Sequence, residues 1–143
     1  MRREIFSEEH ELFRAQFRRF AAQEIAPKIA GWNERGMTDR ATWLRLGEEG
    51  FLGACAPEQY GGAGGDFLYD EILIEELGTL RAHGLMLSLH SDICMPYLIA
   101  YGSDAQRERH LPGTISGETI LGIAMTEPGA GSDLANVQTR AIR

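Results

Sequence analysis

The sequence has 143 residues, of which 43% are hydrophobic and 24% are charged, the composition of a globular domain long enough to bury a core. Its 21 acidic and 14 basic side chains give a formal net charge of −7. This balance argues against nucleic acid or an anionic membrane as the main partner, because both are themselves negatively charged.

Neither a secretory signal nor a membrane span is apparent in the sequence. No uninterrupted apolar stretch precedes Ser7, and polar residues and a proline break the most apolar window, 85–101. The two cysteines, Cys55 and Cys94, have no Cys or His at metal-binding spacing, so we expect buried, reduced thiols and no metal site. The expected compartment is the cytoplasm.

Helical periodicity dominates the sequence up to residue 111. A long amphipathic helix is predicted to begin at Ser7, to be interrupted at Pro27 and to end within 31–36. Its apolar stripe consists of Leu12, Phe13, Phe17, Phe20, Ala21, Ile25 and Ile29, and its solvent face of Arg14, Arg18, Arg19 and Lys28. Aromatic residues at this spacing usually belong to a core, so this helix indicates packing and no chemistry.

Two more helices are predicted on either side of a glycine-rich loop. The first is capped by Thr38 or Asp39 and ends between Gly47 and Gly50. The loop 57–65 lacks the spacing of a phosphate-binding loop and is predicted to be a flexible or tightly turned surface loop. The second helix follows a cap at Asp66 and has its acidic residues on a solvent face: Glu71, Glu75 and Glu76.

Residues 85–101 predict a fourth helix that is apolar almost all round and therefore buried. Its polar residues, Ser88, His90, Ser91 and Asp92, each need a hydrogen-bond partner if they are buried. Because His90 and Asp92 are two positions apart, they do not face each other on a helix, and a catalytic dyad is not expected. A capping box at 103–106 begins a charged helix that 112–113 is predicted to end.

The character of the sequence changes after residue 117. The runs 119–125 and 137–142 predict strands, so the expected fold is mainly α: an N-terminal helical-bundle domain at 1–117, followed by the beginning of a β domain at 118–143. Between the strands, Pro128-Gly129-Ala130-Gly131 predicts a sharp turn. Taken by itself, such a turn is most economically interpreted as a connector.

One segment resembles a known family. Ala124-Met125-Thr126-Glu127-Pro128-Gly129-Ala130-Gly131-Ser132-Asp133 is similar to the flavin-binding segment of the acyl-CoA dehydrogenases. The stretches 57–62, 75–77 and 101–106 resemble the same family, and 89–94 together with 123–126 resemble its long-chain members. The resemblance covers nearly the whole chain. It implies the family's N-terminal helical domain and the start of its middle β domain, without its C-terminal helical domain.

The resemblance also implies a reaction and a site. The reaction is α,β-dehydrogenation of a fatty acyl-CoA thioester with FAD as cofactor, in a homo-oligomer (a tetramer in the full-length family) that passes electrons to an electron-transfer flavoprotein. The implied cofactor-binding residues are Ile123, Ala124, Met125, Thr126, Gly131 and Ser132. The implied substrate-binding residues are Ser132, Leu85, Ser88, Leu89 and Asp92. The family's catalytic glutamate matches no position of this sequence, so we expect a fragment that is inactive alone.

Two alternatives remain open at this point. The chain could be a non-catalytic helical subunit that completes an active site with a partner chain. It could also belong to a flavoenzyme of the same fold with another reaction, such as an acyl-CoA oxidase or a flavin monooxygenase. Oxygen consumption without an electron-transfer flavoprotein would distinguish the last class from a dehydrogenase.

Overall fold

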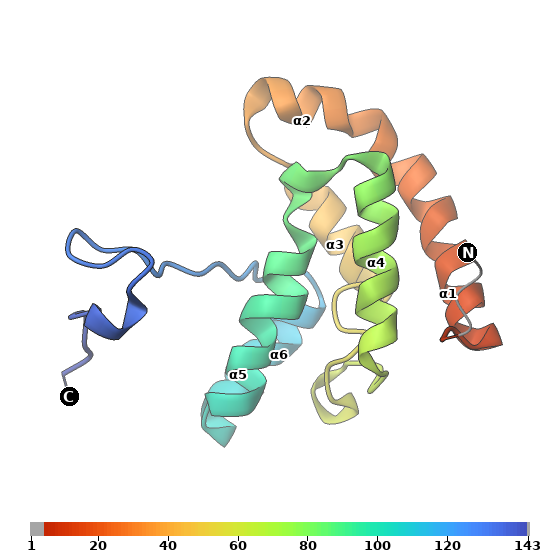
Figure 1. Ribbon diagram of the computed structural model, residues 1–143. Coiled ribbons are helices and arrows are strands. Elements are labelled where there is room, and N and C mark those ends of the chain that lie inside the picture. The colour runs from red at the N-terminus through yellow and green to blue at the C-terminus, as the bar shows by residue number, and fades with distance from the viewer. Residues whose placement is uncertain (1–4, 143) are drawn as a thin grey trace.

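Helices form the body of the computed structural model, which describes residues 5–142 (Figure 1). The α-helices are α1 (Glu8–Phe20), α2 (Ile29–Arg35), α3 (Arg40–Glu48), α4 (Phe67–Leu80), α5 (Met95–Tyr101) and α6 (Asp104–Ile115). Helix α1 packs along α4, α5 packs against α6, and the residues after α6 lead away from this body as an extended tail. The predicted mainly α fold is therefore confirmed.

The first helical unit follows the predicted pattern in its start, its interruption and its end. Helix α1 begins at a Ser7 N-cap and continues through a π-helical turn (Ala21–Ile25) and a 3-10 turn (Ala26–Lys28) that contains Pro27. The interruption at the proline is thus confirmed. The predicted end within 31–36 is confirmed too: Gly31 lies inside α2, and the chain leaves the helix at Gly36, which adopts a left-handed φ of 66°.

Aromatic side chains from distant parts of the chain meet in the main core. Phe17 of α1 and Phe51 of the link after α3 pack edge to face, with ring centroids 4.9 Å apart. The other buried members are Phe20, Ala21, Ile25, Trp32, Trp43, Leu46, Leu52, Leu73, Leu77, Ala82, Leu85 and Leu87. A smaller cluster of Ala56, Met95, Leu111 and Ile115 joins α5 to α6. Leu12, expected in the core, is 66% exposed.

A partly buried ion network joins the predicted solvent faces of α1 and α4. Arg14 and Glu76 are only 7% and 6% exposed, and their side chains are joined at 2.9 Å. Arg18 also binds Glu76, at 2.7 Å, and Arg14 also binds Glu75, at 2.8 Å. The predicted exposure of Arg14 and Glu76 is therefore wrong. The periodicity of each helix could not reveal that the two charged stripes face each other and compensate their mutual desolvation.

The glycine-rich loop is tightly turned and lies against the segment before it. It contains a 3-10 turn (Glu58–Tyr60), and the backbone N–H groups of Ala63 and Gly65 donate to the carbonyls of Gly53 and Ala54. A Cβ at Gly62 would lie 2.1 Å from the carbonyl oxygen of Ala56, so this close approach requires glycine. Asp66 then caps α4 by accepting a hydrogen bond from the Leu68 N–H. The predicted loop and the predicted cap are both confirmed.

The predicted fourth helix is interrupted and only partly buried. A 3-10 turn (His83–Leu85) leads to Met86, whose φ of 54° is left-handed, and a π-helical segment (Leu89–Cys94) precedes α5. Tyr101 is 82% exposed, and Ile93 and Tyr97 are exposed as well, because no described element covers that side of the helix. The expectation of a helix buried all round is wrong.

Helix α6 starts as predicted but does not end at its proline. The Ser103 capping box is formed, with Gln106 as its partner. The helix then continues through Pro112 and Gly113 to Ile115. A proline in the last turns removes one N–H group, and the buried side chains of Leu111 and Ile115 hold this turn against its neighbours.

The described part of the chain has no β-sheet. Its β-structure is an isolated bridge between Glu127 and Ala130, and the runs 119–125 and 137–142 are not paired as strands. A strand is stable only when neighbouring strands take up its backbone hydrogen bonds, and residues 5–142 supply none. Over the same residues, no helix has both the length and the apolar character needed to cross a bilayer.

Candidate functional site

The residues predicted to bind the cofactor lie together in the tail that leaves the helical body (Figure 1). Ala124, Met125 and Thr126 line a hollow of about 280 Å³ together with Leu134, Val137 and Thr139. Ile123, Gly131 and Ser132 are exposed next to this hollow without lining it. Because all six belong to one short segment, their proximity follows from the sequence, whereas the hollow does not.

Glu127 braces this segment, and the sequence analysis did not identify this role. Its carboxylate accepts hydrogen bonds from the backbone N–H groups of Gln138 and Thr139 and from the Thr139 hydroxyl. These donors, with the Thr139 hydroxyl first, lower the pKa of Glu127. Its backbone also exchanges two hydrogen bonds of 3.0 Å with Ala130 across the turn. No sequence signal connects positions 127 and 139, so only the folded chain reveals the brace.

Hydrogen-bonding groups of the tail are available for a ligand. Within the described chain, the backbone N–H groups of 122–126 and the hydroxyls of Thr126 and Ser132 make no hydrogen bond. These groups are exposed, and they follow one another along a single short segment. Such a row of donors suits a planar group with acceptor atoms along its rim, and the glycine-rich turn beside it suits a phosphate. The residues present therefore fit a flavin nucleotide.

His90 fixes the point where the tail begins. Its side chain is fully buried, and its Nε2–H donates to the Thr114 carbonyl at 3.0 Å, while Nδ1 accepts from the Leu121 N–H at 2.9 Å. Desolvation lowers the pKa of His90, against the effect of the bond to Thr114, so the neutral ring is favoured. The predicted need for partners is confirmed for His90, whose partners lie 24 and 31 positions away, but not for the buried Ser91 and Asp92 oxygens, which have none among the described residues.

We expect His90→Phe to loosen the root of the tail. Phenylalanine keeps a ring against Trp43 but leaves the Leu121 N–H without a partner, which costs about 1–3 kcal/mol, while the Thr114 carbonyl keeps the Gly117 N–H. Amide hydrogen exchange at Leu121 should then accelerate by about ten- to a hundredfold. The Gly65 amide, which donates to Ala54, is the internal control. Unchanged exchange at Leu121 would show that His90 does not anchor the tail.

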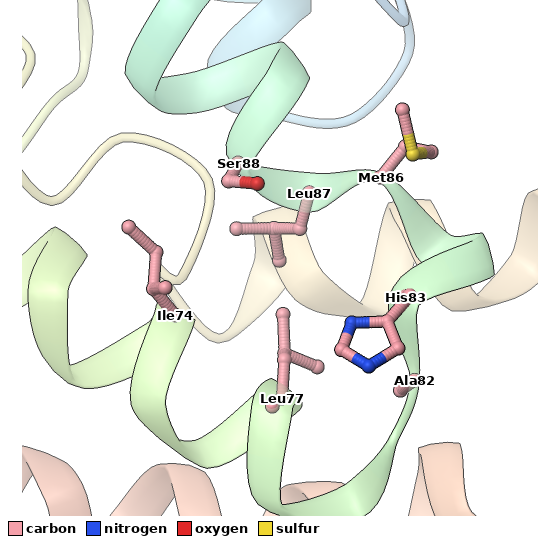
Figure 2. Close-up of a pocket in the computed structure, with 8 residues that line it drawn as sticks. Ile74, Leu77, Ala82, His83, Met86, Leu87 and Ser88 are labelled. Carbon is pink, nitrogen blue, oxygen red and sulfur yellow. The ribbon is translucent and has the colours of Figure 1, made fainter.

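An apolar pocket lies where α4 turns into the following segment (Figure 2). Its volume is about 270 Å³, and its lining consists of Ile74, Leu77, Gly78, Ala82, His83, Met86, Leu87 and Ser88. Figure 2 shows the side chains of Leu77 and Leu87 pointing toward each other between Ser88 and His83. The arrangement offers an apolar surface with a hydroxyl at its edge, as an alkyl chain near a polar group would need.

The predicted substrate residues are not gathered at one place. Ser88 lines the apolar pocket, Leu85 is buried in the main core, and Leu89 is half-buried outside the pocket. Ser132 lies in the tail. Asp92 lies outside the pocket too, and both of its carboxylate oxygens are buried without a hydrogen-bond partner among the described residues.

Asp92 has an electrostatic environment of its own. Burial, together with the nearby carboxylates of Asp70 and Glu71, raises its pKa to about 7.

Cys55 and Cys94 are free and half-buried, so the expected full burial of the thiols is not observed. Over residues 5–142, no three His, Cys, Asp or Glu side chains are placed to hold a metal ion.

Comparison with known proteins gives the family. Residues 7–118 match the profile of the acyl-CoA dehydrogenase N-terminal domain. The mouse mitochondrial long-chain specific acyl-CoA dehydrogenase is 44% identical over 141 residues, which are 99% of this chain and 33% of that protein. The chain thus spans about a third of the length of this curated relative.

Solved structures agree with this assignment. The acyl-CoA dehydrogenase of Geobacillus kaustophilus superposes with a TM-score of 0.89 at 44% identity, over 94% of this chain and 35% of that one. An acyl-CoA dehydrogenase from Bacillus anthracis, solved in complex with FAD, superposes with a TM-score of 0.84 at 27% identity, over 96% of this chain and 24% of that one. Fold and sequence lead to the same conclusion: the chain belongs to the acyl-CoA dehydrogenase family.

Proposed function

We propose that this chain is the N-terminal part of an FAD-dependent enzyme that introduces an α,β double bond into fatty acyl-CoA thioesters. The observation that carries the proposal is the row of free donors at 122–126, next to a glycine turn braced by Glu127, in a chain of this family. The alternatives, a non-catalytic subunit and an oxidase or monooxygenase of the same fold, have no comparable observation in their favour.

The tail would hold the cofactor. The free backbone N–H groups of Ile123, Ala124 and Met125 and the Thr126 hydroxyl would bind the acceptor atoms of a flavin ring. Gly131 and Ser132 would bind its phosphates, because exposed N–H and hydroxyl groups at a glycine turn attract anions. FAD, when bound, supplies the acceptor for the two electrons that leave the substrate. The FAD in the Bacillus anthracis relative supports this assignment.

The helical body would supply one wall for the acyl chain. The apolar pocket beside Ser88 removes hydrocarbon from water and so orients it, and Leu77 and Leu87 provide the contact surface. Leu85, Leu89, Asp92 and Ser132 remain predictions as substrate contacts.

The catalytic base would come from outside this chain. A base that works near neutral pH needs a raised pKa and a free carboxylate. Glu76 is held by Arg14 and Arg18, and Glu127 is held by Gln138 and Thr139. Despite the opposing effect of burial on Glu76, the pKa of each is lowered. We therefore assign these two glutamates structural roles, and the absence of the base from this chain remains a prediction.

Partners follow from the proposed reaction. The electrons would pass to an electron-transfer flavoprotein, and the complete enzyme would be a homo-oligomer. The exposed apolar side of α5, with Tyr97 and Tyr101, is consistent with burial against another part of such an assembly. The boundary at residue 117 and the cytoplasmic location remain predictions.

Thr126→Ala tests the proposal in the polypeptide that carries this chain together with the other domains of the family. Losing one hydrogen bond to the cofactor should weaken FAD binding by about tenfold or slow its anaerobic reduction by acyl-CoA. Thr119→Ala, in the same tail and equally exposed, should leave both unchanged. Unaltered affinity and reduction rate in Thr126→Ala would remove this residue from the site. Rapid oxygen consumption without an electron-transfer flavoprotein would indicate an oxidase instead.

Residues 1–143 alone should bind FAD weakly. The donors of the tail are exposed, and among the described residues the helical body forms no second wall over them. After incubation with FAD and gel filtration, we expect a protein peak with far less than one flavin per chain. A yellow peak with stoichiometric flavin would show that the tail alone is a sufficient site.

A further inference from the structure

A second hollow, of about 350 Å³, lies between the segment 53–56, the first turn of α4 and the start of α5. Its walls are largely apolar, with Met95 and Ile99 on one side and Ala54 on the other. Cys55, Asp70 and Ser91 add polar groups to the lining. None of these residues belongs to the proposed flavin or acyl sites, so the hollow needs its own explanation.

Acidic groups at this hollow are buried without a cation. Asp70 is 6% exposed and accepts a hydrogen bond from the Cys55 thiol, and no cationic side chain of the described chain forms an ion pair with it. Ser91 is 7% exposed, and its hydroxyl makes no hydrogen bond within residues 5–142. Both carboxylate oxygens of the next residue, Asp92, are also buried and make no hydrogen bond within residues 5–142. Uncompensated burial of this kind is costly and is rare in folded proteins.

A cation with hydrogen-bond donors would compensate these groups. Asp70 and Asp92 lie close enough to repel each other, and a positive charge between helix α4 and residues 91–92 would relieve that repulsion. A metal ion is a poor candidate, because no three acidic, thiol or imidazole groups of the described residues converge on one point. The apolar walls instead favour an organic cation with an aliphatic stem.

We propose that this hollow binds a primary alkylammonium group, with the ammonium between the Asp70 carboxylate and the Ser91 hydroxyl and the alkyl stem against Met95 and Ile99. An ammonium is compact and carries three donors, which suits two acceptors in a confined space. A free amine and the side chain of a lysine from another part of the assembly both supply this group, since the chemistry is the same.

Titration with hexylammonium chloride, followed by NMR of the backbone amides of residues 1–143, tests the site. We expect shifts at Asp70, Ser91 and Ile99, and an affinity at least tenfold higher than that for n-hexanol, which has the same stem without the charge. Asp70→Asn should remove this preference, and Ser91→Ala should reduce it. Asp104→Asn, an exposed exchange of the same kind in α6, should leave it unchanged.

Two results would overturn the proposal. The first is equal binding of hexylammonium and n-hexanol, which would make the hollow merely apolar. The second is an undiminished preference in both folded variants, Asp70→Asn and Ser91→Ala. A titration of the longer polypeptide identifies the natural source of the cation: lost binding there means that a side chain of the protein fills the site, and retained binding means that the site takes a free amine. Neither arm depends on FAD or acyl-CoA.

Discussion

Glu76→Ala is expected to lower the free energy of unfolding by about 3–5 kcal/mol. Glu76 is buried between α1 and α4, and it neutralises the buried guanidinium of Arg14 as well as binding Arg18. Removing its carboxylate leaves Arg14 in a poorly hydrated place with only part of its compensation. The loss is a large fraction of the 5–15 kcal/mol that is typical for a whole domain.

Urea unfolding at neutral pH measures this loss. Glu48→Ala is the matched control, because Glu48 pairs with Arg45 on the surface, and such pairs contribute about 0–1 kcal/mol. The deficit should also depend on pH. Burial alone would raise the pKa of Glu76, but Arg18 and Arg14 lower it. The stabilisation by the Glu76 carboxylate is therefore present above the pKa of the unfolded chain, near 4.5, and disappears as the pH falls. A deficit no larger than that of Glu48→Ala would refute the structural role.

Asp92→Asn is expected to stabilise the protein above neutral pH. The pKa of Asp92 is about 7 in the folded chain, against 3.8 for an ordinary aspartate, because burial and the neighbouring Asp70 and Glu71 disfavour its charge. Stability is therefore highest with the carboxyl protonated, and it declines as the pH rises from about 4 to about 7. Because Asp92 is partly exposed, its ionisation lowers the free energy of unfolding above pH 7 by less than the full shift implies, about 2–4 kcal/mol.

Urea unfolding of both proteins at acid and alkaline pH checks this dependence. The advantage of Asp92→Asn should be near zero around pH 4, grow with pH and level off above pH 7, because asparagine imitates the protonated acid. Asp133→Asn, in the exposed tail, should show no such trend. A constant difference between wild type and Asp92→Asn at all pH values would mean that ionisation of Asp92 is not the cause.

Local features of the fold were predictable because their interactions span only a few residues. The caps at Ser7, Asp39, Asp66 and Ser103 are all formed by side chains that bond to N–H groups two or three positions ahead. The errors occur where a distant contact overrides the local rule. Pro112 stays within α6 because neighbouring side chains are buried, although prolines usually end helices.

In the candidate site, too, the features within one short segment were predictable and the distant contacts were not. Resemblance located the tail segment and its donors, since a contiguous motif keeps its residues together in any fold. It could not reveal that Glu127 binds Thr139 or that His90 holds Leu121. The predicted substrate residues were scattered, because the break at Met86 changes which residues of 85–92 face the same pocket. Helical periodicity assumes an unbroken helix.

The sequence by itself determined the mainly α class, the helix starts, the tightly turned loop and the family, because caps, glycine turns and contiguous motifs depend on nearby residues. Only the tertiary structure decided that Arg14 and Glu76 are buried partners, that His90 anchors the tail, and that Asp70, Ser91 and Asp92 are buried without a cation. These outcomes depend on which faces meet across the fold. A charged or polar side chain occurs in the same sequence pattern whether it faces water or another helix. Its contribution to the free energy of unfolding differs by several kcal/mol between these two environments.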